Sequence, residues 1–252
     1  MTPQDTLLEV ERLSYSFNGQ KAVDDISLSI RKGEIFGLLG PNGAGKTTTI
    51  SCIAGLRQSA SGEMRFAGSP FAPASRASHR GRLGVVPQEL ALYDSLTARE
   101  NLRFFASVSG LGKQAADLEA QRSLELGGLS DRADDRVSTY SGGMKRRLNL
   151  VVGCLNNPDL IILDEPTVGV DPQSRNHIFD ALEKLSEDGH TLLYTTHYME
   201  EAERLCSRIA IMDRGRIVAI GSADELADRA GIPGADLERV FLELTGKRLR
   251  DG

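Results

Sequence analysis

A glycine-rich run from Gly40 to Thr48 holds the first residues with an evident chemistry, because it contains the pattern G-x-x-x-x-G-K-[ST]. The run follows a short apolar stretch, Ile35–Leu39, and its last residues begin a stretch expected to be helical, Lys46–Leu56. Glycines let such a loop curl until its N–H groups point inward, and the helix N-terminus adds partial positive charge. The loop is therefore expected to hold the phosphates of a nucleotide.

Individual residues of this loop have expected parts. Lys46 is expected to reach the β- and γ-phosphates, and the hydroxyl of Thr47 to ligate Mg²⁺. A bulky side chain at Gly43 or Gly45 would block the approach of a phosphate. Taken alone the pattern could be a turn without function, but the order strand, loop, helix favours nucleotide binding. The expected phosphate-binding residues are Asn42, Gly43, Ala44, Gly45, Lys46, Thr47 and Thr48.

Two adjacent acids, Asp164 and Glu165, end a second apolar run, Leu160–Leu163. An acid at the carboxyl end of a buried strand lies at the crevice where α/β sheets bind ligands. We expect Asp164 to hold Mg²⁺ and Glu165, on the other face of the strand end, to orient the attacking water or accept its proton. Alone, such a pair could be a solvated strand end; the phosphate loop upstream favours the catalytic interpretation.

The elements that must position these residues alternate between strands and helices, which predicts an α/β fold. Strands are expected near 7–15 and 23–30, joined at Asn18-Gly19, and then at 63–66, 83–86, 160–163, 191–195, 209–212 and 217–220. Residues 59–81 are expected to be mostly loop.

Helical periods dominate from Gln88 to about Asn156, which predicts an inserted helical lobe. A capping box at Thr97 opens a helix whose Leu102, Phe105 and Val108 are expected to share a face. Further helix starts are expected at Ser141 and at Asp171, the latter followed by Pro172 and a buried stripe of Ile178, Leu182 and Leu185.

Composition limits the possible classes. The chain has 252 residues, 40% of them hydrophobic, and a formal net charge of -5, which suits one large domain and argues against a non-specific nucleic-acid binder. Its three cysteines are far apart and predict neither a disulfide framework nor a zinc site, so a reduced compartment is expected. The residues Met1–Asp5 lack signal-peptide features, and no apolar run approaches the ~20 residues that cross a bilayer. We therefore expect a soluble, cytoplasmic protein.

A resemblance enters with Tyr140–Arg147, which reads YSGGMKRR and is similar to the signature Leu-Ser-Gly-Gly-Gln. With the other motifs in order, the chain resembles the nucleotide-binding subunit of ATP-binding cassette (ABC) transporters over nearly its whole length. The resemblance implies an ATPase with a P-loop NTPase core, whose RecA-like sheet is mostly parallel, and an antiparallel β subdomain, over 1–87 and 157–221. It also implies an inserted α-helical signature subdomain over 88–156 and a helical tail over 222–252.

In that family the signature closes on the ATP of the opposite subunit, so the resemblance implies a head-to-tail homodimer with two complete sites. Ser141, Gly142 and Gly143 stand at an expected helix N-terminus and would contact the γ-phosphate. Met144 replaces the usual glutamine, which puts any contact of that side chain in doubt.

Other family positions carry over one at a time. Gln88 resembles the glutamine that touches Mg²⁺ and communicates with the membrane partner, and His197 resembles the switch histidine at the γ-phosphate. Phe17 resembles the aromatic that stacks on adenine, with Tyr15 on the same strand face as the second choice. Asp171 stands where an aspartate contacts the other subunit, although it could serve only as a helix cap. The implied catalytic residues are thus Glu165, His197 and Lys46, and the implied Mg²⁺ ligands Thr47, Gln88 and Asp164.

Several stretches resemble ABC-2 type exporters, among them Thr195–Glu201 and the tail Leu237–Gly246, although Arg239 replaces a common acid there. This implies a separate membrane permease and a place on the inner face of the cell membrane. The segment with Leu90, Leu92 and Tyr93 is our hypothesis for the permease-docking surface. The triplet Lys145–Arg147 is interpreted as a solvated helical face and not as a nucleic-acid patch, and no nucleic-acid partner is expected.

Three alternatives stay open. A non-transport cassette ATPase could act on a nucleic-acid or ribosomal partner, but such members usually carry a second cassette or a long coiled coil. A P-loop kinase or GTPase would lack the signature. A purely regulatory nucleotide-binding module would not need both Glu165 and His197.

Overall fold

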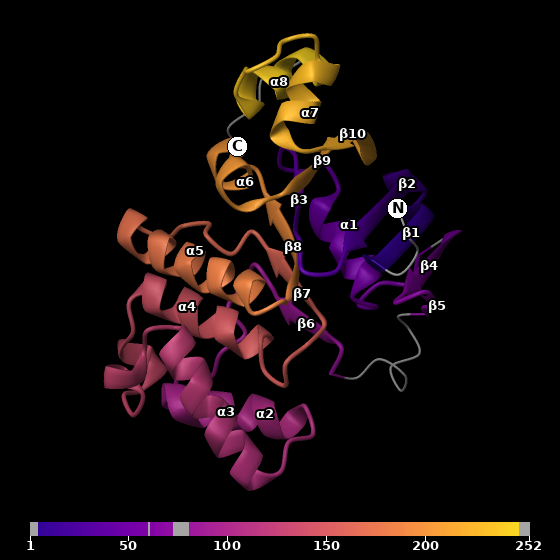
Figure 1. Ribbon diagram of the computed structural model, residues 1–252. Coiled ribbons are helices and arrows are strands. Elements are labelled where there is room, and N and C mark those ends of the chain that lie inside the picture. The colour runs from indigo at the N-terminus through magenta and orange to yellow at the C-terminus, as the bar shows by residue number, and fades with distance from the viewer. Residues whose placement is uncertain (1–4, 60, 73–80, 247–252) are drawn as a thin grey trace. The chain divides into compact units, whose positions relative to one another are not determined.

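The computed structural model describes residues 5–59, 61–72 and 81–246, which belong to two compact units. The first unit comprises Met1–Ser78 and Thr191–Gly252, and the second comprises His79–His190 (Figure 1). The predicted partition into core, helical lobe and tail stays a prediction. Most of the residues used against a signal peptide, much of the loop expected at 59–81 and the end of the predicted tail lie outside the described residues.

The described residues of the first unit form strands of two sheets, helices beside them and two tail helices. They are β1 (Thr6–Phe17), β2 (Gln20–Arg31), β3 (Ile35–Leu39), α1 (Lys46–Ile53), β4 (Ser61–Phe66), β5 (Ser69–Pro70), β8 (Thr191–Thr196), α6 (Met199–Leu205), β9 (Arg208–Asp213) and β10 (Arg216–Gly221), followed by the tail helices α7 (Ala223–Arg229) and α8 (Leu237–Thr245).

An antiparallel sheet with the order β2-β1-β4-β5 forms from the predicted hairpin and the strand after it (Figure 1). The hairpin turns at Asn18 and Gly19, both at positive φ (46° and 84°), as a tight two-residue turn requires. Leu8, Val10 and Leu13 of β1 are buried. The predicted hairpin is confirmed, with strands longer than expected at both ends.

The other strands of this unit run in the order β10-β9-β3-β8, with β3 parallel to both neighbours and β9 antiparallel to β10. All five residues of β3 are buried, as its continuous apolar run predicts. Leu39 pairs with Thr196, so β3 and β8 end at the same edge. The phosphate loop and His197 therefore start from one edge of this sheet.

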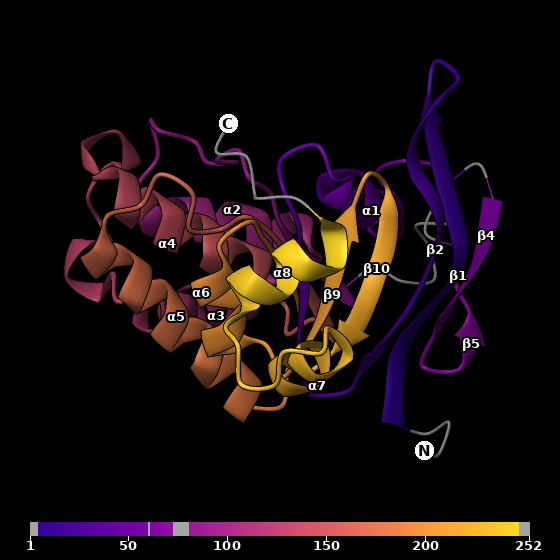
Figure 2. The same ribbon diagram turned by 90° about the horizontal axis from the view of Figure 1, so that it is seen from above.

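The tail helices cover β9 and β10, and Figure 2 shows α7 and α8 beside this pair of strands. Leu226 of α7 and Val240 and Phe241 of α8 are buried against Ile209 and Ile211. The predicted hairpin β9–β10 is confirmed, and the described part of the tail contains two helices, α7 and α8.

The second unit is mostly helical and carries two parallel strands. Its elements are β6 (Leu83–Val86), α2 (Ala98–Val108), α3 (Lys113–Leu126), η2 (Ser130–Arg132), η3 (Val137–Thr139), α4 (Gly142–Gly153), β7 (Leu160–Asp164) and α5 (Pro172–Glu187). Val86 of β6 pairs with Leu163 of β7, so these strands also end together. The chain beyond Val86, including Gln88, thus leaves the edge at which Asp164 and Glu165 stand.

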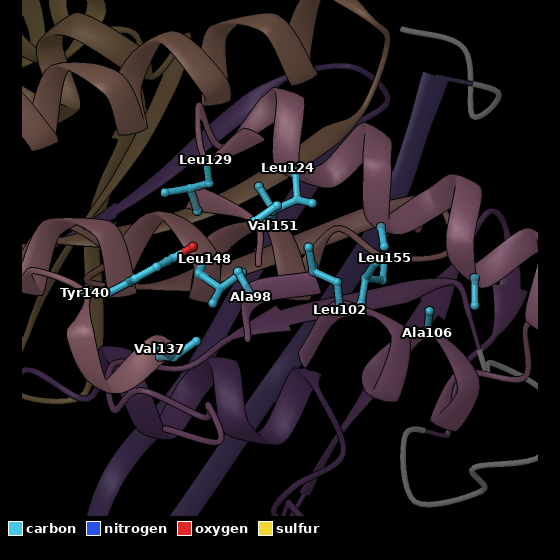
Figure 3. Packing of buried hydrophobic residues seen from close by; sticks show 13 residues of the cluster. Ala98, Leu102, Ala106, Leu124, Leu129, Val137, Tyr140, Leu148, Val151 and Leu155 are labelled. Carbon is cyan, nitrogen blue, oxygen red and sulfur yellow. The ribbon is translucent and has the colours of Figure 1, made fainter. Parts of the chain in front are cut away.

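Helices α2, α3 and α4 share a hydrophobic cluster with the chain between α3 and α4. Its labelled members gather around Leu148 and Val151 of α4 (Figure 3). The capping box at Thr97 is confirmed. The expected face of α2 is partly wrong: Leu102 is buried, but Val108 is 69% exposed. Six residues turn a helix by about 600°, which sets Val108 roughly 120° from Leu102, whereas Ala98 and Ala106 lie one turn away on the buried side.

Candidate functional site

The phosphate loop joins β3 to α1 with glycine conformations at two positions. Gly43 and Gly45 have φ of 79° and 105°, in the left-handed region that favours glycine. A Cβ at Gly45 would lie 2.5 Å from the carbonyl oxygen of Ala22, whereas a Cβ at Gly43 would meet nothing within 4 Å. Gly45 is therefore required by packing inside the protein, and Gly43 stands beside open space.

Lys46 lies across this loop and is only 4% exposed. Its Nζ donates to the carbonyl oxygens of Gly40 (2.7 Å) and Pro41 (3.2 Å). Asn42 and Thr47 are exposed, and Thr48 is half-buried. A cationic Nζ beside the N–H groups of a helix N-terminus fits an anionic phosphate, and Gly43 stands beside open space.

His197 follows β8 at the same edge as the phosphate loop, and the N–H of Gly40 donates to the carbonyl of Thr196 at 3.3 Å. The His197 ring is half-buried, with its centroid 4.0 Å from that of Tyr198. A buried acid, Glu201, accepts hydrogen bonds from the hydroxyls of Tyr194 and Thr196, each at 2.8 Å. The sequence-based interpretation did not single out Glu201, although an acid four residues after a strand-end histidine lies one turn along the next helix.

The proposed adenine-stacking residue, Phe17, is 42% exposed at the end of β1. Its ring packs edge-on against Tyr15, with centroids 4.9 Å apart. The guanidinium of Arg57 lies 4.8 Å from the Phe17 centroid and 5.8 Å from that of Tyr15. The structure thus brings both candidate aromatics together and adds a cation, Arg57, that the sequence patterns did not indicate.

Asp164, the last residue of β7, and Glu165, directly after it, are both buried, at 5% and 6% exposed. The simpler interpretation as a solvated strand end therefore does not apply. Glu165 has a φ of 46°, a left-handed conformation that costs a non-glycine residue roughly 1–3 kcal/mol and clusters at functional sites. Its carbonyl accepts from the N–H of Val168 at 3.2 Å. The chain therefore holds one carboxylate in a strained, buried position.

The signature segment forms the start of α4, as predicted. Ser141 is the N-cap, accepts from the N–H of Met144 at 3.2 Å, and is exposed. A Cβ at Gly143 would lie 2.0 Å from Ser174 Oγ and 3.2 Å from Asp171 Oδ2, so the starts of α4 and α5 are packed together. The N–H of Ser174, donating at 3.0 Å, holds the pKa of the Asp171 carboxyl below its ordinary value. Asp171 is the helix cap that its sequence context predicts.

The interpretation of Lys145–Arg147 as a solvated face is wrong. Lys145 pairs with Asp94 at 2.8 Å, and Arg146 donates to the carbonyl of Gln88. Arg147 donates to the carbonyls that end α3, Gly127 (2.8 Å) and Gly128 (3.0 Å), and burial lowers the pKa of both arginines. These partners lie up to 58 positions away in the sequence, beyond the reach of a local pattern.

Each unit thus gathers part of the predicted site. The first carries the phosphate loop, His197 and Phe17; the second carries Asp164, Glu165 and Gln88, which is exposed, together with the signature residues. Among the described residues no group of three or more His, Cys, Asp or Glu could hold a metal ion. The predicted magnesium ligands, Thr47, Gln88 and Asp164, carry a hydroxyl, an amide and a carboxylate oxygen, the ligand types that magnesium accepts, and stay a prediction. In the part of the chain that the structure describes, every helix is too short or too polar to span a membrane.

Comparisons with known proteins agree with these observations. Residues 23–168 match the family model described as ABC transporter. The linearmycin resistance ATP-binding protein LnrL of Bacillus subtilis is 48% identical over 89% of this chain and 72% of its own. The Nod factor export ATP-binding protein I of Paraburkholderia xenovorans is 42% identical over 94% of this chain and 77% of its own.

Solved structures give the same result. An ATP binding subunit of an ABC transporter superposes with a TM-score of 0.85, at 32% identity, over 95% of this chain and all of its own. Clostridium perfringens cbiO1, part of the ABC transporter complex cbiONQ, has a TM-score of 0.81 at 27% identity, over 89% of this chain and 91% of its own. The predicted α/β P-loop NTPase fold is confirmed. A phosphate loop, a buried acid pair and a signature helix start thus coincide with this similarity, and the chain belongs to the ABC transporter family as one of its ATP-binding, ATP-hydrolysing domains.

Proposed function

We propose that this chain binds ATP with Mg²⁺, hydrolyses the bond between the β- and γ-phosphates, and so drives export through a separate ABC-2 type permease. The observation that carries the proposal is the presence, in one chain, of two helix starts suited to phosphate. One is the loop with Lys46 before α1; the other is Ser141 before α4, exposed and capping. A buried, strained Glu165 supports catalysis over simple binding.

The residues of the site then have separate tasks. The loop N–H groups and Lys46 hold the β- and γ-phosphates, and Phe17 carries the adenine. Thr47, Gln88 and Asp164 would hold Mg²⁺, which would supply positive charge beside the phosphates. Glu165 orients the attacking water and accepts its proton, and His197 donates a hydrogen bond to the γ-phosphate.

The second helix start serves the partner. Ser141, Gly142 and Gly143 address the ATP held by a second copy of this chain, so that nucleotide joins two copies head to tail. Support comes from the exposure of Ser141 and Gly142 and from the packing of Gly143 against α5, which leaves this helix start facing outward. Each homodimer then has two complete sites.

Export and membrane attachment rest on the relatives and on one surface. Two relatives are named for linearmycin resistance and for Nod factor export, which supports an exporter. Leu90 is 40% and Tyr93 48% exposed, and the Tyr93 ring packs on Phe104 and Phe105 at 5.0 and 5.9 Å. Apolar side chains held this way suit a short permease helix, which would place the chain on the inner face of the membrane.

Two variants test the ATPase assignment. Glu165→Gln keeps the size of the side chain but removes the base, so it should trap an ATP-bound dimer with little turnover. Lys46→Ala should abolish ATP binding. Size-exclusion chromatography with ATP and Mg²⁺, together with phosphate release, measures both effects. Equal hydrolysis by the wild type and Glu165→Gln would refute the assigned base.

The docking surface needs a sharper test than charging Leu92, which packs against the hydrophobic cluster of α2–α4. Leu90→Asp with Tyr93→Asp should leave ATP binding intact and abolish co-purification with the permease. The matched control is Leu118→Asp, at a leucine that is 56% exposed on α3 of the same unit. Retention of the permease by the Leu90→Asp, Tyr93→Asp chain would contradict the docking assignment.

A further inference from the structure

The segment Pro87–Asp94, which contains Gln88 and the proposed docking residues, is fastened to the signature helix by side chains of α4. The amide of Asn149 donates to the carbonyl of Pro87 at 3.1 Å and accepts from the N–H of Ala91 at 3.0 Å. Between these two points the guanidinium of Arg146 donates to the carbonyl of Gln88. The backbone on either side of Gln88 is thus held by one helix.

These contacts differ in strength. Asn149 is 2% exposed, so breaking its hydrogen bonds would leave buried polar groups unpaired, the costly case for a hydrogen bond. Arg146 is half-buried and makes a charge-assisted bond. Lys145 pairs with Asp94, whose side chain is 60% exposed, and an exposed ion pair of this kind contributes little. Asn149 and Arg146 are therefore the firm contacts from α4, while Asn101 of α2 holds Tyr93 at the far end of the segment through its N–H (2.8 Å) and its carbonyl (3.0 Å).

The ties lie on the helix that begins at Ser141. Asn149 is eight residues along α4, which spans 12 residues, so it stands about 12 Å from the cap along a continuous helix. A helix of this length moves as a rigid body, whereas its partner here is irregular backbone. A shift of the helix start should therefore move the segment Pro87–Asp94 instead of breaking both hydrogen bonds of the buried Asn149 side chain.

We propose that Asn149 and Arg146 are positioning residues that make the Gln88 segment follow the signature helix, so that closure of Ser141 on nucleotide reaches the permease-docking surface. This inference rests on the proposed function for the direction of the signal. The tie itself depends only on contacts within the second unit. Arg146, the middle residue of the triplet Lys145–Arg147, thus gains a function in place of the solvated face expected from sequence.

Hydrogen exchange of the full chain, with and without ATP and Mg²⁺, tests the proposal. Without nucleotide, Asn149→Leu and Arg146→Met should each raise the exchange of residues 88–94 by roughly 10-fold or more, since each loses a bond that holds this backbone. With nucleotide, the wild type should change its exchange both at 141–146 and at 88–94. In the two variants, nucleotide should change the hydrogen exchange of residues 141–146 alone.

The controls separate the tie from general loosening. Lys145→Met removes one positive charge from the neighbouring position of α4 and should keep the wild-type response at 88–94, and Arg146→Lys, which restores a donor, should regain it. If Asn149→Leu does not fold, as thermal melting will show, Arg146→Met carries the test. The proposal is overturned if ATP changes the hydrogen-exchange rates of residues 88–94 in Arg146→Met as much as it does in the wild type. A wild-type chain without ATPase activity would contradict the proposed function instead, and the nucleotide-free exchange rates would still decide whether the tie exists.

Discussion

The hydroxyl of Thr196 donates a 2.8 Å hydrogen bond to the carboxylate of Glu201. Thr196 directly precedes His197, and the buried Glu201 lies four positions after His197. The same hydroxyl oxygen accepts from the N–H of Tyr198 at 3.0 Å. The backbone on both sides of His197 is thus fixed by one small network. Such a network suits a histidine that must stay aligned with a reacting phosphate.

Removal of the Glu201 carboxylate should therefore affect catalysis as well as stability. Glu201→Ala leaves the hydroxyls of Tyr194 and Thr196 without their shared acceptor, which should lower the free energy of unfolding by ~1–3 kcal/mol. It should also lower kcat for ATP hydrolysis by roughly 10-fold or more, with little change in KM, because His197 loses its alignment. Urea denaturation and steady-state kinetics measure the two effects.

The neighbouring Glu200 provides the control, since it is exposed one position earlier on the same helix. Glu200→Ala should keep wild-type kcat, and Glu201→Gln, which retains an oxygen acceptor, should recover part of the activity. A wild-type kcat in Glu201→Ala would show that the network is structural only.

Gly142 and Gly143 should respond differently to the same substitution. A Cβ at Gly143 would overlap Ser174, so Gly143→Ala should lower the free energy of unfolding by ~1–3 kcal/mol through overpacking. A Cβ at Gly142 would meet nothing within 4 Å, so Gly142→Ala should leave stability unchanged or slightly raised. Chemical denaturation of the two variants measures the contrast.

A second change should rescue the first. Gly143→Ala combined with Ser174→Gly removes the overlapping atoms and should recover most of the lost stability. If Gly143→Ala alone is as stable as the wild type, then the starts of α4 and α5 are not in the close contact described above.

The phosphate loop gives a similar contrast. Gly45→Ala would put a Cβ on a residue with left-handed φ and too close to the carbonyl of Ala22. It should therefore destabilise the fold by ~2–4 kcal/mol. Gly43→Ala meets only the backbone strain, about 1 kcal/mol, and should fold but bind ATP more weakly because its methyl faces the open side of the loop. Thermal melting and titration with a fluorescent ATP analogue distinguish the two. Equal melting temperatures for both variants would contradict the packing role of Gly45.

Sequence reasoning succeeded where a signal is local. The turn at Asn18-Gly19, the capping box at Thr97 and the Asp171 cap each depend on residues within four positions, and all three are confirmed. The burial of β3 follows likewise from its apolar run. The roles of individual site residues stay predictions, because they depend on nucleotide and on a partner.

Predictions from the sequence were wrong or missing where interacting residues are distant along the chain. The basic triplet of α4 looks solvated until Asp94 and Gln88, more than 50 positions away, are placed beside it. The position of Arg57 over Phe17 and the two hydroxyl groups that donate to Glu201 are also contacts that no local sequence pattern indicates. Val108 was misplaced because a spacing of three residues drifts around a helix that turns every 3.6.

The cysteines should be inert in the folded chain. Burial raises the pKa of the Cys154 thiol to about 12 and also raises that of Cys52 and of the half-buried Cys206, because burial removes water that would solvate a thiolate. At pH 8 the folded chain should therefore carry almost no Cys154 thiolate, the reactive form. A maleimide should therefore label the native chain slowly and the urea-unfolded chain at once.

The same shift makes stability depend on alkaline pH. The unfolded thiol loses its proton near its ordinary pKa of 9.0, whereas the folded Cys154 keeps its proton until about pH 12. Between these values the unfolded chain binds fewer protons than the folded one, so the free energy of unfolding should fall as pH rises through this window. Cys154→Ala, compared with the wild type by urea denaturation at pH 8 and pH 10, should show a smaller fall. Rapid labelling of Cys154 in native buffer at pH 8 would mean that α4 opens locally far more often than its buried packing allows, since the labelling rate reports the open fraction.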